Sequence, residues 1–180
     1  MVTKIKAIYE NEVVPYLTET FEYKNVHEIP KIEKIQINRG LGITAQNNKI
    51  LQKSIDEIRQ ITGQQPVVTI AKKSIAGFKV REEMPMGITV TLRKEKMYSF
   101  LDRFINLTLP RIRDFQGLDP KKLDKNGNYN LGITDQLIFP EIEYEQVDQM
   151  LGLNITIVTT AKNSKEGLAL LQKVGIPFRK

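Results

Sequence analysis

Apolar residues in the middle of the chain recur first with a helical and then with a strand period, and this change of period constrains the fold most. The helical stripe consists of Ile50, Leu51, Ile55, Ile58 and Ile61. Its i, i+3, i+4 spacing predicts an amphipathic helix, which Gly63 is placed to end. The segments 66–71 and 86–93 that follow predict two strands, with the residues between them as a long hairpin. Helical and strand periods in one chain predict an α+β fold.

The remaining apolar segments follow the same two periods. The other predicted helices cover residues 5–21, 97–105 and 164–171, and the other predicted strands cover 31–38 and 153–160. Pro15 is expected to kink or end the first helix, because proline lacks the amide proton and its ring crowds the preceding turn. Residues 111–131 are rich in turn residues and predict a long loop, which is functional or ordered by a partner.

The composition bounds the class of protein. With 180 residues, 41% of them hydrophobic, the chain can form a real core, and we expect one domain over residues 1–180 or at most two closely packed halves. A net charge of +6 and a pI near 9.4 favour a polyanionic partner without excluding a basic enzyme. The absence of cysteine excludes disulfides, a thiolate nucleophile and a cysteine zinc site.

The predicted hairpin carries a concentrated positive charge. Lys72, Lys73, Lys79 and Arg81 fall within ten residues, together with the aromatic Phe78. Basic side chains neutralise phosphates, and an exposed aromatic ring can stack on an unpaired base, so this run is typical of an RNA-contacting loop. The alternative is an ordinary solvated hairpin.

Patterns that would indicate an enzyme are incomplete. Gly40-Leu41-Gly42 lacks the third glycine of a dinucleotide-binding fingerprint, and residues 124–128 lack the glycine and the bidentate glutamate of a calcium loop. The acidic segment, formed by Glu141, Glu143, Glu145 and Asp148, has no histidine or cysteine beside it. The single histidine, His27, is interpreted as structural or exposed. We therefore predict no catalytic residue, no metal site and no cofactor.

The N-terminal residues 1–14 are basic but contain no apolar signal core and no Arg- and Ser-rich transit character. No span of 18 apolar residues follows them. We therefore expect the protein to work where it is made, and not in a membrane.

Several long motifs resemble one family throughout the chain. The run 58–64 with 66–79 is similar to the signature of the large-subunit ribosomal protein number five, the 5S-rRNA-binding family. Further similar motifs, in the same order and spacing, are VTLRKEKMYSFLDR (90–103), LPRIRDFQGL (109–118), GNYNLGITDQLIFPEIEY (127–144), DQMLGLNITIVTTAK (148–162) and GIPFRK (175–180). The resemblance covers essentially the whole chain.

This resemblance implies an antiparallel sheet with helices packed on one face and a polar opposite face that takes a loop of 5S rRNA. The polar set implied to face the RNA is Asn38, Gln64 and Thr91, whose amide and hydroxyl groups suit base edges and 2′-hydroxyls. The set implied to bind phosphates is Lys72, Lys73 and Arg93.

The resemblance also implies contacts beyond 5S rRNA. The extended hairpin over 74–86 would reach the tRNA in the peptidyl site, and the loop over 111–131 would face a small-subunit protein at an inter-subunit bridge. The implied tRNA contacts are Ser74, Phe78, Lys79 and Arg81. Large-subunit rRNA is a further implied partner. Glu82 and Glu83 depart from the family pattern, so the tRNA contact is expected to rely more on Lys79 and Arg81.

The motifs near TLRKEKMY and DQLIFPEIEY look more like cyanobacterial and plastid members than others. We therefore expect a ribosome location in the plastid stroma, with an organelle-encoded protein, and the bacterial cytoplasm as second choice. Two alternatives of other classes stay open: a free-standing RNA-binding regulatory protein, which a high-salt wash would separate from large subunits, and a small enzyme, which would need a pocket with perturbed titratable groups.

Overall fold

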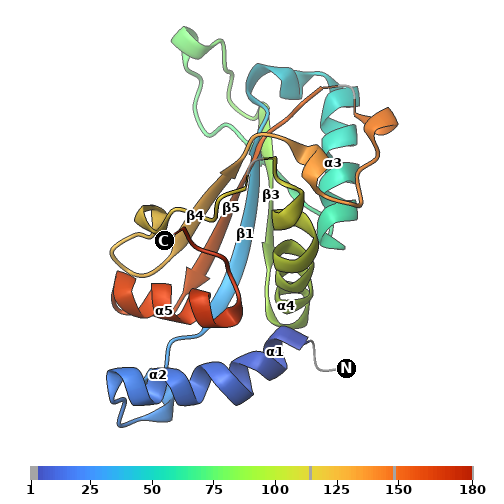
Figure 1. Ribbon diagram of the computed structural model, residues 1–180. Helices are drawn as coiled ribbons and strands as arrows, with labels where there is room; N and C mark the ends of the chain where they lie inside the picture. Colours follow the sequence, from blue (N-terminus) through green and yellow to red (C-terminus); the bar gives the residue numbers. More distant parts are fainter. Residues whose placement is uncertain (1–3, 114, 148, 180) are drawn as a thin grey trace. The chain divides into compact units, whose positions relative to one another are not determined.

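The computed structural model describes residues 4–113, 115–147 and 149–179 of the chain. Across these residues, five strands form one antiparallel sheet in the order β2-β3-β1-β5-β4, accompanied by helices (Figure 1). The strands are β1 Ile32–Gly40, β2 Val67–Ile70, β3 Pro85–Leu92, β4 Tyr129–Ile133 and β5 Leu153–Thr159. The α-helices are α1 Lys4–Ile8, α2 Val14–Phe21, α3 Asn48–Thr62, α4 Lys94–Arg103 and α5 Ser164–Val174. The predicted α+β fold is confirmed.

The chain groups into two compact units. The first comprises residues 1–35, 92–131 and 156–180, and the second comprises 36–91 and 132–155. Each unit has its own buried apolar residues, such as Leu17 and Phe104 in the first and Ile37 and Ile58 in the second. The single domain over residues 1–180 stays a prediction.

The helices of the first unit pack on one another, α1 against α4 and α2 against α5. The helical residues of α1 and α2 are joined by a π-helical turn over Tyr9–Val13, so Pro15 does not end this helix. In that turn Val14 donates its N–H to the carbonyl of Tyr9, five residues back. We infer that the wider turn makes room for the proline ring, which would clash with a regular α-helical turn.

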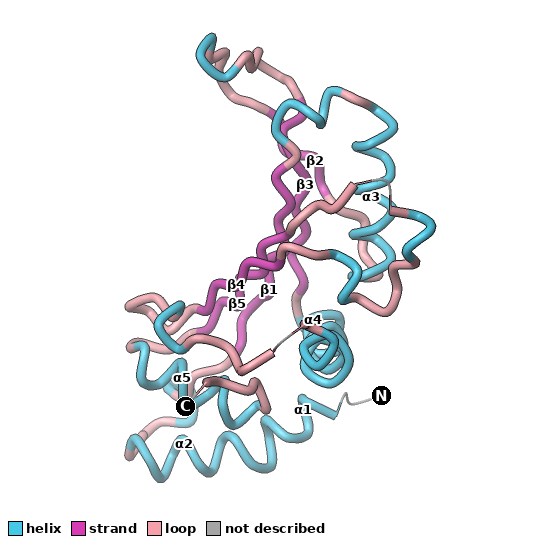
Figure 2. The backbone as a smooth tube through the Cα atoms, turned by 45° about the horizontal axis from the view of Figure 1, so that its top comes forward, coloured by secondary structure: helices cyan, strands magenta, loops and turns pink. Residues whose placement is uncertain are grey.

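The second unit contains the predicted amphipathic helix and hairpin. Ile58 and Ile61 on α3 are buried, and Gly63 ends the helix in the left-handed conformation, at a φ of 66°, which glycine adopts without steric cost. β2 and β3 pair antiparallel, with Val67 opposite Thr89. In Figure 2, α3 lies to one side of β2 and β3. Both sequence predictions are therefore confirmed.

The described part of the segment 111–131, in the first unit, contains regular structure and is not one long loop. Its last three residues are the start of β4, a strand that the sequence analysis missed. Its middle is tied to the C-terminal residues, because Leu118 donates its N–H to the Pro177 carbonyl at 2.8 Å and accepts from the Arg179 N–H at 2.9 Å. The end of the chain therefore acts as a strap on this segment.

An aromatic pair supports the strap. The rings of Tyr129 and Phe178 meet edge to face with their centroids 5.5 Å apart, and the Tyr129 hydroxyl donates to the carbonyl of Asp119 at 3.2 Å. Burial, with a smaller effect of the Asp119 charge, raises the pKa of Tyr129 to about 12. The phenol is therefore neutral at physiological pH and serves as a fixed donor.

Replacing Phe178 with alanine should loosen the strap. The ring contact to Tyr129 is lost while the backbone bonds of Leu118 can still form, so we expect the free energy of unfolding to fall by about 1–3 kcal/mol. Hydrogen exchange of residues 116–123 should rise, and exchange in α3 is the internal control. If exchange of 116–123 stays at the wild-type rate, the Phe178 ring does not hold the segment.

Candidate nucleic-acid interface

The sheet residues of the second unit present one apolar and one polar face. Ile37, Ile88 and Val90 are buried on the apolar face. The alternate residues are exposed or half-buried and uncharged. The exposed Val67 of β2, which lies opposite Thr89, is apolar. The polar ones on β1, β2 and β3 are Gln36, Asn38, Thr69, Thr89 and Thr91. We call these five residues the open face. Amides and hydroxyls suit recognition of base edges and 2′-hydroxyls. The Thr89 hydroxyl already donates to the Ile37 carbonyl at 3.2 Å, so it is left to act as an acceptor.

Two of the three residues implied to face RNA belong to the open face. Asn38 is exposed on β1, and Thr91 is half-buried near the end of β3. Gln64 lies instead just beyond the end of α3, where its side-chain amide donates to the Thr91 carbonyl at 3.2 Å. The structure therefore brings Gln64 and Thr91 together, with part of the Gln64 amide engaged by the backbone of β3.

Sequence reasoning missed Gln36, Thr69 and Thr89 as members of the open face. The signal was present, because residues two apart on a strand point to the same side. Gln36 lies two residues before Asn38 on β1, and Thr89 lies two residues before Thr91 on β3, so the members of each pair point to the same side. Thr69 follows from pairing, since it lies opposite Gly87 on β3.

The predicted phosphate-binding cations are all exposed but come from different places. Lys72 and Lys73 follow β2 after one intervening residue, Ala71, and open the hairpin of the second unit. Arg93 follows the last residue of β3 and belongs to the first unit. Within the second unit, exposed lysines and uncharged polar side chains match the usual division between phosphate contacts and base contacts.

The hairpin between β2 and β3 projects beyond both strands (Figures 1 and 2). Its tip is closed by its own hydrogen bonds, since Ile75 and Val80 exchange backbone bonds of 2.9 and 3.2 Å. The Ser74 hydroxyl accepts from the Glu82 N–H at 2.9 Å across the tip. Ser74, implied to contact tRNA, thus helps to hold the tip together in the free chain.

The outer side of this tip combines apolar and positive groups. Phe78 is 70% exposed and Ile75 is 50% exposed, with Lys79 and Arg81 exposed beside them. Lys79 takes a left-handed backbone conformation, with a φ of 53°, which is costly for a residue that is not glycine.

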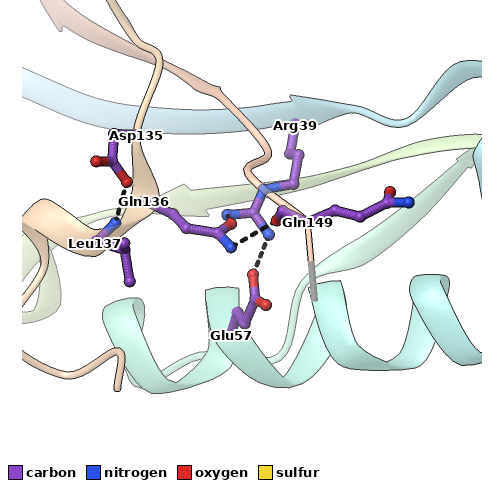
Figure 3. Close-up of polar contacts among 6 residues, drawn as sticks. All are labelled: Arg39, Glu57, Asp135, Gln136, Leu137 and Gln149. Carbon is purple, nitrogen blue, oxygen red and sulfur yellow. Dashed lines mark hydrogen bonds and ion pairs between the residues drawn. The ribbon is translucent and has the colours of Figure 1, made fainter. Parts of the chain in front are cut away.

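A buried polar cluster behind the open face was not predicted (Figure 3). Arg39, with no exposed surface, extends from β1 and donates to Glu57 of α3 at 2.5 Å and to the Gln136 side chain at 2.7 Å. Gln136 in turn donates to the carbonyl of Gln149 at 3.1 Å. The cluster joins β1, α3 and the segment 136–149 within the second unit.

The remaining candidates for chemistry have no site geometry. In the acidic segment Glu141 is half-buried and Glu143 and Glu145 are exposed, while Asp148 lies outside the described residues. Among residues 4–113, 115–147 and 149–179, no group of acidic residues and histidine is arranged to hold a metal ion. No helix within those ranges is both long and apolar enough to cross a bilayer.

The loop at 124–128 is a turn, as predicted. The Asp124 carboxylate accepts from the backbone N–H groups of Asn126 and Asn128 and from the Asn128 side chain, at 2.7–2.9 Å. Burial raises the pKa of Asp124, but these hydrogen bonds outweigh it and leave the pKa below the ordinary value of 3.8. The carboxylate is therefore engaged by its own loop.

A sheet face with uncharged polar groups and exposed lysines in the same unit is typical of a nucleic-acid-binding protein, and comparison with known proteins identifies the family. Residues 25–81 match the model described as ribosomal protein L5, and residues 85–178 match the model that describes the C-terminus of the same ribosomal family. The chain belongs to the ribosomal protein L5 family.

Whole-length relatives agree with this assignment. The chain is 64% identical to the large ribosomal subunit protein uL5c of Heterosigma akashiwo, over 98% of this chain and 97% of the relative. It is 62% identical to uL5c of Porphyra purpurea, over 99% of both chains. It is 60% identical to uL5 of a Nostoc species, over 98% of this chain and 97% of the relative.

These relatives decide between the classes considered from the sequence. The chain is a structural constituent of the large ribosomal subunit and not an enzyme. Relatives from algal plastids and from a cyanobacterium also confirm the predicted location on a ribosome of plastid type.

Proposed function

We propose that this chain binds a loop of 5S rRNA on the open face and so helps to attach that RNA to the large subunit. One observation carries the proposal. Asn38, Thr89 and Thr91 line up uncharged polar groups on neighbouring strands, and the exposed Lys72 and Lys73 come one residue after the end of the next strand, β2. The arrangement supports reading of an unpaired loop by the strands and neutralisation of its phosphates by the lysines.

Within this proposal the predicted residues take different tasks. Asn38 and Thr91 contact the RNA directly, whereas Gln64 acts partly through the Thr91 carbonyl that it holds. Lys72, Lys73 and Arg93, which are all exposed, bind phosphates.

The hairpin and the strapped segment serve other partners in the same proposal. Phe78, Lys79 and Arg81 reach the tRNA in the peptidyl site, and Ser74 closes the tip that presents them. Residues 111–131 meet a small-subunit protein at an inter-subunit bridge, where the strap of the C-terminal residues keeps them ordered. Large-subunit rRNA is a further partner, which binds other basic residues of the surface.

Binding of isolated 5S rRNA over a salt series tests the division between phosphate and base contacts. Lys73→Ala should flatten the slope of log K against log salt by roughly 0.7–0.9, because one phosphate contact is lost. Asn38→Ala should weaken binding by about 1–3 kcal/mol at an unchanged slope, because its partner on the RNA is left unsatisfied.

The matched control is Lys165→Ala, which removes an exposed lysine from α5. This variant should bind as the wild type does, with the same slope. If Asn38→Ala also binds normally, the RNA does not lie on the open face. If Lys73→Ala keeps the wild-type slope, Lys73 does not touch a phosphate.

A further inference from the structure

Two glycines lie next to each other where β1 and β3 pair, and the fold requires only one of them. A Cβ atom on Gly87 would stand 2.5 Å from the carbonyl oxygen of Arg39 and 3.3 Å from the Cα of Gly40. Such a contact is far inside van der Waals distance, so the pairing of β1 with β3 depends on a glycine at 87. A Cβ atom on Gly40 would meet nothing within 4 Å.

Backbone conformation does not require glycine at position 40 either. Gly40 is the last residue of strand β1, and its φ lies outside the left-handed region that favours glycine. It is also exposed. Glycine weakens a strand because it has no side chain to pack and leaves the unfolded chain more freedom. Glycine at position 40 therefore lowers the stability of the folded chain, and neither its surroundings nor its φ requires a glycine there.

Glycine in a strand also marks places where a ligand comes close to the backbone. The surroundings of Gly40 fit this explanation. Asn38 precedes it on the same side of β1, and the Thr69 hydroxyl lies 3.3 Å from the Cβ position of the neighbouring Gly87. The exposed main chain of Gly40 thus continues the open face beyond Asn38, as a place without a side chain.

We propose that Gly40 is the point of closest approach between the main chain and the bound RNA. The ribose or base of one unpaired nucleotide packs flat on the bare backbone there, while the Asn38 amide contacts its edge. The ligand, and not the fold, requires glycine at this position. This inference rests on the proposed function of the open face and adds a contact that excludes any side chain.

Gly40→Ala and Gly40→Val test the inference, with isolated 5S rRNA as the probe. Gly40→Ala should leave the melting temperature unchanged or raise it by about 1–3 °C, because the added methyl group meets no neighbour and restricts the unfolded chain. RNA binding should weaken by about ten- to a hundredfold, because the methyl group intrudes on a packed contact. Gly40→Val should weaken it further. The salt slope should stay at the wild-type value, since no phosphate contact is lost.

Gly77→Ala is the matched control. Gly77 also has open space around its Cβ position and an ordinary φ, but it lies in the hairpin tip. We expect this variant to bind 5S rRNA as the wild type does.

The outcomes separate the inference from the proposed function. If Asn38→Ala weakens binding and Gly40→Ala does not, the open face binds RNA but Gly40 is not a point of close approach. If Gly40→Ala lowers the melting temperature, the fold requires this glycine and the inference is wrong. If the wild-type protein does not bind 5S rRNA, the proposed function itself fails.

Discussion

Arg39→Ala should lower the free energy of unfolding by about 3–5 kcal/mol, the largest loss of stability that we expect from replacing any one arginine of this chain. Arg39 has no exposed surface, and the Glu57 side chain that it pairs with is only 11% exposed. Removing the guanidinium leaves the Glu57 carboxylate buried without its charge partner. Urea unfolding followed by far-UV circular dichroism measures the loss.

Arg93→Ala is the matched control, because it truncates an arginine that is exposed. Its effect should stay within about 0.5 kcal/mol. The double variant Arg39→Met, Glu57→Leu should recover most of the loss, since apolar groups of similar size leave no buried charge behind. If Arg39→Ala is as stable as Arg93→Ala, the buried cluster does not hold the second unit together.

The cluster also has a consequence for the segment 136–149. The Gln136 side chain accepts from Arg39 and donates to the Gln149 carbonyl, so Arg39 holds the side chain that joins residue 136 to residue 149. Hydrogen exchange there should rise in Arg39→Ala. Because Arg39 directly follows Asn38 on β1, the same substitution should also weaken RNA binding through the open face.

Strong local signals made much of the fold predictable. The helix at α3 has a full apolar stripe and a glycine at its end, and Gly63 adopts the left-handed conformation that such an end requires. The last helix, α5, likewise begins after Asn163 and ends at Gly175, with a φ of 109°. In these segments local propensity and tertiary packing agree, so the sequence alone is sufficient to predict the two helices.

Prediction failed where tertiary contacts override a local rule. The sequence predicts a kink or an end at Pro15; the helix does not end there, and a π-helical turn stands directly before α2. β4 is short and follows turn residues, so the sequence predicts a loop through Leu131 and misses the strand alternation of Tyr129, Leu131 and Ile133. Only pairing with another strand makes such a segment ordered.

The buried arginine could not be predicted for a similar reason. A charged residue near the end of a strand is usually exposed, and its burial requires partners distant in the sequence. Glu57 is 18 residues from Arg39 and Gln136 is 97 residues away. The available signal was the alternation along β1, because Arg39 falls on the same side of the strand as the buried Ile35 and Ile37.

Removing the charged and aromatic groups of the hairpin tip should abolish protection of the tRNA elbow on ribosomes that carry this protein. The variant combines Phe78→Ala, Lys79→Asn and Arg81→Gln. It keeps the backbone bonds between Ile75 and Val80, which need no side chain, and asparagine tolerates the left-handed conformation at position 79. The loss follows because stacking and phosphate contacts at the tip come from these three side chains.

Chemical footprinting of peptidyl-site tRNA measures this effect directly, and binding of 5S rRNA to the isolated variant is its control. Because Lys72, Lys73 and the open face are unchanged, 5S rRNA should bind with wild-type affinity. A second variant, Ser74→Ala, loses the acceptor for the Glu82 N–H but keeps all three contact groups. It should reduce protection only partly, since the Ile75–Val80 pairing still closes the tip. Full protection in the triple variant would exclude the tRNA role of the hairpin, and loss of 5S rRNA binding would show that the two sites are not separate.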